Sequence, residues 1–374
     1  MNLITDEYFM QMALVLYIIF ILVLIVFEYD RIFNYIIMIV SPLVLGFVSW
    51  IWILRPDYNR YESTYYAIEN ISDGKAYPVW SMIMLSAKVC HLQFRLYQTI
   101  IVILSISIIE IVAFKMFHRV NATMGTIWVY PGIIGIIQIR QYFSLSLLYL
   151  SLFFFIRSFH IKKSRENKQS CIYVFASILF ALLSVGVHAT SIVMVTFYLL
   201  YFFNGSKIKY VICLFAVLFI AQIVYPAISN KIMISILGEQ QTTVYDTYGV
   251  MVGNNISEFS AIAVALVICI VNMGMCKYIN KKKNLNDTHG NAIATVSLLE
   301  TSEYVSFVPL LLNFLDTMRL QRFSILTTAG MIDAYPFERK GLLLVVRCIF
   351  FGSMFILLRW SAPWNSMISE LSSF

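Results

Sequence analysis

Residues 96–114 read LYQTIIVILSISIIEIVAF, a nearly unbroken apolar run whose one charged residue is Glu110. An α-helix needs about 20 such residues to cross the hydrocarbon core of a bilayer. Because backbone N–H and C=O groups find no water in that core, a single segment crosses it as a helix, which pairs those groups internally. The run therefore predicts a transmembrane helix.

The rest of the chain has the same character. Its 374 residues are 60% hydrophobic and 13% charged, with a mean hydropathy of +0.79, whereas soluble proteins are about 25% charged. This composition excludes a soluble enzyme, a disordered tail and a secreted disulfide scaffold. The six cysteines and five histidines are scattered, so we expect no metal site and no cofactor. The predicted fold is all-α, a polytopic transmembrane helical bundle that forms a single integral-membrane domain over residues 1–374.

Apolar windows predict about 12 spans. They lie near 8–27, 32–54, 96–114, 125–139, 142–159, 171–187, 189–203, 211–228, 260–276, 292–313, 323–334 and 341–358. The first run is long and lacks a basic leader, so we expect a retained span and not a signal peptide. The stretch 79–94 is short and contains Lys88 and His91, which favours an outer interfacial or re-entrant helix that does not cross.

Lysine and arginine positions predict the orientation of the chain, because short cytoplasmic loops are enriched in them. Basic clusters identify 160–170 and 277–291 as cytoplasmic loops, and alternation then places 55–95 and 229–259 outside. The net charge of +7 is therefore largely a topology signal. We expect the lipid bilayer, and no nucleic acid, as a partner.

The first outward segment begins with Asp57 between Arg55 and Arg60, accompanied by Tyr58 and Tyr61. Carboxylates, arginines and exposed aromatic rings together suit a carbohydrate, because sugar hydroxyls bond to the charged groups and apolar ring faces stack on the aromatics. The alternative for the aromatic residues is an ordinary belt at the membrane interface.

Arg140-Gln141 lies between the apolar runs 125–139 and 142–156, with almost no loop around it. An ionisable residue so close to the membrane is costly and indicates function. The planar donor fork of arginine suits phosphate oxygens. The alternative is an arginine that only anchors a tight turn at the interface.

Two further polar sites are predicted on the outer side. His188 follows span 171–187, where it is either a polar helix end or a general base. Arg319 and Arg322 lie near Asp316 and form either a salt-bridged helix end or a third cationic site.

Four charged residues fall inside predicted spans: Glu110, Glu300, Glu303 and Arg347. Pairing of Arg347 with one of the glutamates would satisfy both groups within the bundle. A proton relay would indicate a transporter, but the sequence contains no inverted repeat that favours one.

Four short motifs together resemble the EpsG branch of the Wzy-like polysaccharide polymerases. They are Leu54-Arg55-Pro56-Asp57-Tyr58, Ile139-Arg140-Gln141-Tyr142, Val187-His188-Ala189-Thr190-Ser191 and Arg322-Phe323-Ser324-Ile325, in the family's order. The chain departs from the family pattern in lacking the glycine between Arg55 and Asp57, the usual residues after Arg-Gln, and the tyrosine after Arg322.

The resemblance implies a metal-independent glycosyltransferase of the membrane GT-C type. Such an enzyme transfers a growing glycan from undecaprenyl-pyrophosphate to a lipid-linked oligosaccharide repeat unit at the outer face of the bacterial cytoplasmic (inner) membrane. The product is a capsule, an exopolysaccharide or an O-antigen. Chain-length regulator and flippase proteins are expected partners.

The same resemblance implies roles for individual residues. Arg140 and Arg322 would hold the pyrophosphate with help from Arg319, and Asp57 or His188 would deprotonate the acceptor hydroxyl. The remaining expected substrate-binding residues are Arg55, Arg60, Gln141, Tyr58 and Tyr61.

Two other functions stay open from sequence. A flippase of lipid-linked oligosaccharide would bind the same headgroup without forming a bond. A membrane O-acyltransferase would use His188 as its base.

Overall fold

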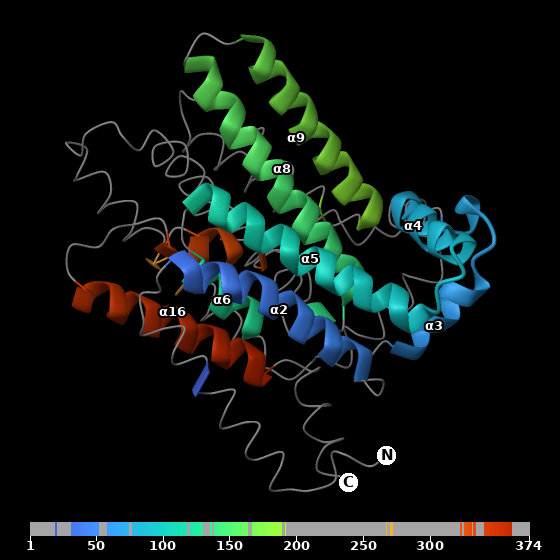
Figure 1. Cartoon of the computed structure of the whole chain (residues 1–374), viewed down its shortest axis with the longest axis horizontal. Helices are drawn as coiled ribbons and strands as arrows, with labels where there is room; N and C mark the ends of the chain where they lie inside the picture. The colour runs from blue at the N-terminus through green and yellow to red at the C-terminus, as the bar shows by residue number, and fades with distance from the viewer. Residues whose placement is uncertain are drawn as a thin grey trace, which may run out of the picture.

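All secondary structure in the described part of the chain is helical (Figure 1). The computed structural model describes residues 19–20, 31–51, 58–74, 77–117, 120–129, 135–136, 138–163, 167–188, 191, 267, 270–271, 322–323, 325–330, 332–333 and 340–360. The named elements are α2 (Arg31–Ile51), α3 (Tyr58–Ala67), η1 (Ile71–Gly74), α4 (Pro78–Val89), α5 (Phe94–Phe117), α6 (Asn121–Trp128), α8 (Ile139–Lys163), α9 (Asn167–Val187) and α16 (Lys340–Trp360).

Four of these helices are long and apolar enough to cross a membrane, within α2, α5, α8 and α9. They confirm the spans predicted near 32–54, 96–114, 142–159 and 171–187, so the chain is a multi-pass membrane protein. Helix α16 matches the predicted span 341–358 in extent and contains a shorter apolar stretch, Leu344–Met354.

Several predictions fall on residues that the structure does not describe. The spans near 189–203, 211–228 and 292–313 lie there, as do nearly all of 8–27 and 260–276. Loops 229–259 and 277–291 also lie there. The total of about 12 spans therefore stays a prediction.

The continuous span predicted over 125–139 is wrong. Helix α6 has only eight residues and ends at Trp128. The sequence then runs through Tyr130-Pro131-Gly132. Proline cannot donate to a helix and disfavours helical geometry in the residue before it, so the chain stops its helix here.

The loop predicted over 160–170 is also shorter than expected, because α8 extends to Lys163 and α9 begins at Asn167. Its basic residues therefore lie largely on the ends of two helices.

Within the segment 55–95, the chain forms two short helices and a 3-10 turn. Helix α4 has 12 residues and is too short to be among the candidate spans, as expected for 79–94. The turn after it uses a left-handed residue, His91, with φ 55. Lys88 donates from Nζ to the carbonyls of Tyr66 (3.1 Å) and Ile68 (2.6 Å), which ties α4 to the C-terminal end of α3.

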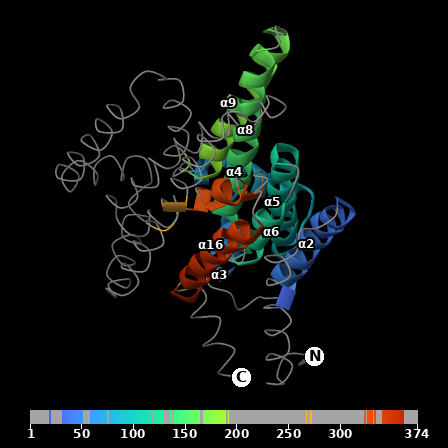
Figure 2. The same cartoon turned by 90° about the vertical axis from the view of Figure 1, so that its left-hand side faces the viewer.

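Helices α2 and α5 pack side by side and run in opposite directions (Figures 1 and 2). The Tyr35 and Phe114 rings lie 5.1 Å apart between centroids at one end of the pair. At the other end, the Arg95 guanidinium lies over the Trp50 ring, 5.3 Å from its centroid.

A ladder of serines joins α8 to α9. Serines recur at every seventh position in both helices, at Ser144, Ser151 and Ser158 in α8 and at Ser170, Ser177 and Ser184 in α9. Ser144 and Ser184 each donate to the other's carbonyl, at 2.9 and 2.7 Å. Ser151 donates to the carbonyl of Ser177 at 2.6 Å, and Ser170 to that of Ser158 at 3.1 Å. Small hydroxylated residues let two membrane helices approach closely and bond to each other, so this ladder determines the register of the hairpin.

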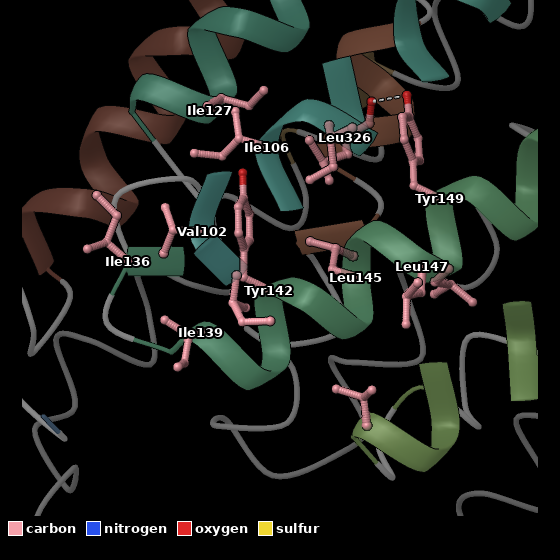
Figure 3. Close-up of a cluster of buried hydrophobic side chains, with 14 of the residues drawn as sticks. Val102, Ile106, Ile127, Ile136, Ile139, Tyr142, Leu145, Leu147, Tyr149 and Leu326 are labelled. Atoms are coloured by element: carbon pink, nitrogen blue, oxygen red, sulfur yellow. Dashed lines mark hydrogen bonds between the residues drawn. The ribbon is translucent and has the colours of Figure 1, made fainter. Parts of the chain in front are cut away.

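Figure 3 shows how α8 meets α5. The Tyr142 ring, from the first turn of α8, lies beside Val102 and Ile106 in the middle of α5. Farther along α8, Tyr149 donates to the carbonyl of Leu326 at 3.5 Å.

A buried aspartate holds α6 in place. Asp333 accepts hydrogen bonds from the backbone N–H groups of Ala122 (2.7 Å) and Thr123 (3.0 Å) and from the Thr123 hydroxyl (3.1 Å). Arg347 of α16 interacts electrostatically with the same carboxylate. Of the three glutamates considered as partners of Arg347, Glu110 does not pair with it, because both Glu110 oxygens are buried without a hydrogen-bond partner. Glu300 and Glu303 lie outside the described residues.

Replacement of Ser151 by leucine should separate α8 from α9, because the added side chain enters a contact that holds only a hydroxyl. Overpacking of this kind costs about 1–3 kcal/mol, whereas Ser151→Ala should cost only about 0.6 kcal/mol, the average for a hydrogen bond between membrane helices. Thermal unfolding of the detergent-solubilised variants measures the difference. Ser86→Leu, at an exposed serine of α4, is the matched control, and equal losses for both leucine variants would contradict the ladder.

Replacement of Asp333 by leucine should destabilise the protein by at least about 1–3 kcal/mol, since it leaves buried N–H groups at the start of α6 without an acceptor. Thermal unfolding tests this expectation. Asp73 is the control because it also accepts backbone N–H bonds, from Glu69 (2.9 Å) and Asn70 (2.7 Å), which lower the pKa of its carboxyl. Since Asp73 is exposed, water can replace its bonds, and Asp73→Leu should have the smaller effect.

Candidate functional site

Three elements meet around the beginning of α8. They are the first turn of α8, the C-terminal end of α9 and the residues that start α4. Gly186 lets α4 approach α9, because a Cβ atom at this position would lie 2.3 Å from a methyl group of Val79. The close contact brings Tyr77, the residue immediately before α4, to the ends of both long helices.

Arg140 stacks on Tyr77. The guanidinium carbon lies 3.7 Å from the centroid of the Tyr77 ring. Arg140 is half-buried, and its Nε is buried without a hydrogen-bond partner. A cation over a tyrosine face is attracted by the ring, by about 2 kcal/mol when water is excluded. This contact holds the guanidinium but leaves its hydrogen-bonding capacity unsatisfied.

The serine ladder between α8 and α9 also places His188 beside Arg140 and Tyr77. Arg140 precedes Ser144 by four residues and His188 follows Ser184 by four, so the register that pairs the serines also places these two residues at one level. The buried His188 ring lies 5.9 Å from the Tyr77 ring, between centroids. Tyr77 thus contacts both Arg140 and His188.

Arg322 joins the beginning of α8 from the C-terminal part of the chain. Its Nη1 donates to the side-chain oxygens of Gln138 (2.8 Å) and Gln141 (2.6 Å). Gln138 lies immediately before α8 and Gln141 lies in its first turn, so both amides are at the same end of the helix. Since Arg140 and Gln141 are adjacent in the chain, the two arginines flank the first turn of α8.

A wall of aromatic rings borders this site. Tyr97 of α5 is close enough to interact electrostatically with Arg140 and Tyr61. Its ring packs against Trp80 at 5.8 Å and stacks on Tyr65 at 5.1 Å, between centroids. Tyr65, Trp80 and Tyr97 are buried, so these rings form a packed aromatic cluster beside Arg140 and not the exposed rings expected to stack on a carbohydrate.

Tyr58 and Arg60 occupy different environments on α3. Tyr58 is buried against Phe94, with ring centroids 5.3 Å apart. Arg60 is exposed, and no contact among the described residues joins its guanidinium to Arg140, His188 or Arg322.

The structure brings together four of the expected site residues: Arg140, His188, Gln141 and Arg322. Tyr61 is connected to this group only indirectly, because Tyr97 interacts electrostatically with both Tyr61 and Arg140. Arg55, Asp57 and Arg319 lie outside the described residues, so their expected roles stay predictions. Among the described residues, no three His, Cys, Asp or Glu side chains form a group with the arrangement of a metal site.

Two residues of the site are absent from the sequence-based set of site residues. Tyr77 is one of many aromatic residues in the segment 55–95, and its one local signal is that the Pro78 after it marks a helix start. Gln138 has a clearer signal, because Gln138 and Gln141 form an i, i+3 pair beside a functional arginine. Neither pattern shows that Tyr77 contacts Arg140 or that the two glutamines bind Arg322.

The arrangement is suited to binding an anion. Arg140 presents a planar cation held by an aromatic face, and Arg322 presents a second one held by two neutral amide oxygens. A phosphate group would supply the acceptor oxygens that the Arg140 Nε lacks. His188 supplies an imidazole, the side chain that most often serves as a general base in enzymes.

Comparison with curated proteins and with solved structures returned no match, whereas a protein-family model, described as the EpsG family, matches residues 34–369. The match includes all of α2 except its first three residues, the named helices that follow it, and all the residues of the site. The resemblance inferred from short motifs is therefore confirmed. The chain belongs to the EpsG family, which is linked to exopolysaccharide biosynthesis.

Proposed function

We propose that this protein is a polysaccharide polymerase, a glycosyltransferase that joins lipid-linked oligosaccharide repeat units at the outer face of the bacterial cytoplasmic membrane. The donor is a growing glycan on undecaprenyl pyrophosphate. The acceptor is a single repeat unit on the same lipid. Family membership supports a role in making such a polymer, and the geometry of the site supports the chemistry.

The observation that carries the proposal is the state of Arg140. Its guanidinium is half-buried and stacked at 3.7 Å on Tyr77, and its Nε has no hydrogen-bond partner. Burying such a donor is costly unless a partner arrives. A pyrophosphate leaving group is a suitable partner, because its charge increases as the glycosidic bond breaks and the arginine binds the charged form more strongly.

The reaction balances without another reactant. A hydroxyl oxygen of the acceptor sugar attacks the anomeric carbon of the donor glycan, and the bond from that carbon to the pyrophosphate oxygen breaks. The electron pair leaves with undecaprenyl pyrophosphate, while the hydroxyl proton passes to a base. The polymer is then one repeat unit longer and remains attached to the acceptor lipid.

Two residues are candidates for the base. His188 is buried at the same level as Arg140 and contacts the ring on which the arginine stacks. Asp57 is the alternative suggested by the family motif. We assign pyrophosphate binding to Arg140 and Arg322, and positioning of the Arg322 guanidinium to Gln138 and Gln141.

Arg140→Ala should abolish long chains while single repeat units persist on lipid. Loss of one group that stabilises developing charge slows a reaction roughly 10²- to 10³-fold. The assay supplies purified protein with its lipid-linked repeat unit and resolves chain lengths by electrophoresis. An unchanged ladder in the variant would refute the assignment. Polymer formed by wild type in detergent excludes a flippase, and ester formed from an acyl donor would favour an O-acyltransferase.

The chain provides a matched control for this experiment. Arg157 of α8 also lies over an aromatic ring, 5.5 Å from the centroid of Phe153, but it is near the other end of the helix. Arg157→Ala should therefore leave the ladder of chain lengths unchanged.

Tyr77→Leu should reduce polymerisation at least roughly tenfold, because it removes the aromatic face that holds Arg140 and packs against His188. Tyr77→Phe keeps the face and should retain activity within about threefold. Initial rates of dimer formation measure both effects. Equal losses in the two variants would show that the hydroxyl, and not the ring, matters. Tyr66→Leu, at an exposed ring of α3, is the control.

A further inference from the structure

A second arginine stacks on an aromatic ring at the end of the bundle that carries α3 and α4. Arg95, in the first turn of α5, lies over Trp50, near the end of α2, with 5.3 Å between the guanidinium carbon and the ring centroid. The Arg95 side chain is half-buried, and its Nε is buried without a hydrogen-bond partner. This is the same arrangement as that of Arg140 on Tyr77.

Arg95 and Arg140 lie on different sides of α5. Arg95 contacts α2 through Trp50, whereas Tyr97 faces Trp80 and interacts electrostatically with Arg140. Residues two positions apart point in nearly opposite directions on an α-helix, and a helix with its side chains is about 10–12 Å wide. The two guanidinium groups therefore contact different neighbours on different sides of α5.

Apolar surface accompanies Arg95. Helix α2 exposes Leu43, Phe47 and Ile51 at four-residue intervals, which form a stripe that ends beside Trp50, and α5 exposes Leu96 next to Arg95. A cation at one end of an exposed apolar stripe is complementary to a lipid that has a phosphate headgroup and a long hydrocarbon chain.

Tyrosines connect the two arginines across the first turns of α5. Tyr58 packs on Phe94 at 5.3 Å and Tyr65 stacks on Tyr97 at 5.1 Å, between centroids. Helix α3 thus crosses α5 at residues on either side of Arg95 in sequence. These rings are buried and form a packed cluster, which holds the first turns of α5, and with them Arg95, in a fixed position relative to Arg140.

We propose that Arg95 and Trp50 bind the pyrophosphate of the acceptor lipid, while Arg140 binds that of the donor. This inference rests on the proposed polymerase function. In such a reaction the acceptor hydroxyl is at the far end of the repeat unit from its own pyrophosphate. The two pyrophosphates must therefore lie about one repeat unit apart, which requires a second cationic site at a distance from the first.

Binding stoichiometry tests the second site without relying on catalysis. The probe is radiolabelled geranylgeranyl pyrophosphate, added to the full-length protein in nanodiscs of phosphatidylcholine. Wild type should bind two molecules, and Arg95→Gln and Arg140→Gln should each bind one. The lost site should weaken roughly tenfold or more, since a hydrogen bond between charged groups is removed. Equal stoichiometry in wild type and Arg95→Gln would overturn the site.

Further variants separate a specific site from a general lipid contact. Trp50→Leu should weaken the same site that Arg95→Gln removes, and Arg157→Gln should leave both sites intact. Arg95→Lys is the control for loss of binding through misfolding, because lysine retains the positive charge and should retain part of the affinity. Displacement of the Arg95-dependent molecule by an equal concentration of phosphatidylglycerol would overturn the proposal in favour of a general phospholipid contact.

Kinetics then test the acceptor role. Arg95→Gln should raise the KM for the lipid-linked repeat unit about tenfold and leave kcat within about threefold, whereas Arg140→Gln should lower kcat. Polymer formation by a protein that binds one probe molecule would refute the second site but leave the polymerase function standing. Two probe molecules bound without any polymer formed would refute the polymerase function and, with it, the acceptor role.

Discussion

The register between α8 and α9 is the constraint on which the rest of the site depends. Three pairs of serines, spaced by seven residues in both helices, bond the two helices along their length. Within a membrane the hydrophobic effect does not push helices together, so close packing and interhelical hydrogen bonds decide how they meet. A slip by one turn would move His188 away from Arg140 by about 5.4 Å. The ladder thus sets the geometry of groups that it does not itself include.

Aromatic rings stabilise two arginine side chains near the membrane in the absence of a ligand. A guanidinium paired with a carboxylate would be stable, but the pair would resist an incoming phosphate. Tyr77 and Trp50 instead attract the cation through their ring faces and leave its N–H groups for a ligand. Gln138 and Gln141 orient the Arg322 guanidinium through their neutral amide oxygens.

Sequence patterns predicted part of this site for clear physical reasons. Arg140 stands out because a charge between apolar runs is costly, and His188 because it follows a complete span. The partners of these residues were harder to predict. In the sequence Tyr77 resembles the other aromatic residues of its segment, and only the packing of α4 against Gly186 places it beside Arg140. Asp333 was not identified at all, since the groups that donate hydrogen bonds to it are backbone N–H groups about 210 residues away, at Ala122 and Thr123.

The sequence by itself determined the class of the molecule and the position of its long helices. Length and hydropathy suffice for α2, α5, α8 and α9, because the bilayer requires about 20 apolar residues per crossing whatever the helix packs against. Hydropathy did not predict the end of α6, because the apolar run continues past Trp128. Only the tertiary structure decided which charges meet. Hydropathy treats all faces of a helix alike, whereas contact depends on rotation and register, and these follow from small residues such as Ser144, Ser184 and Gly186.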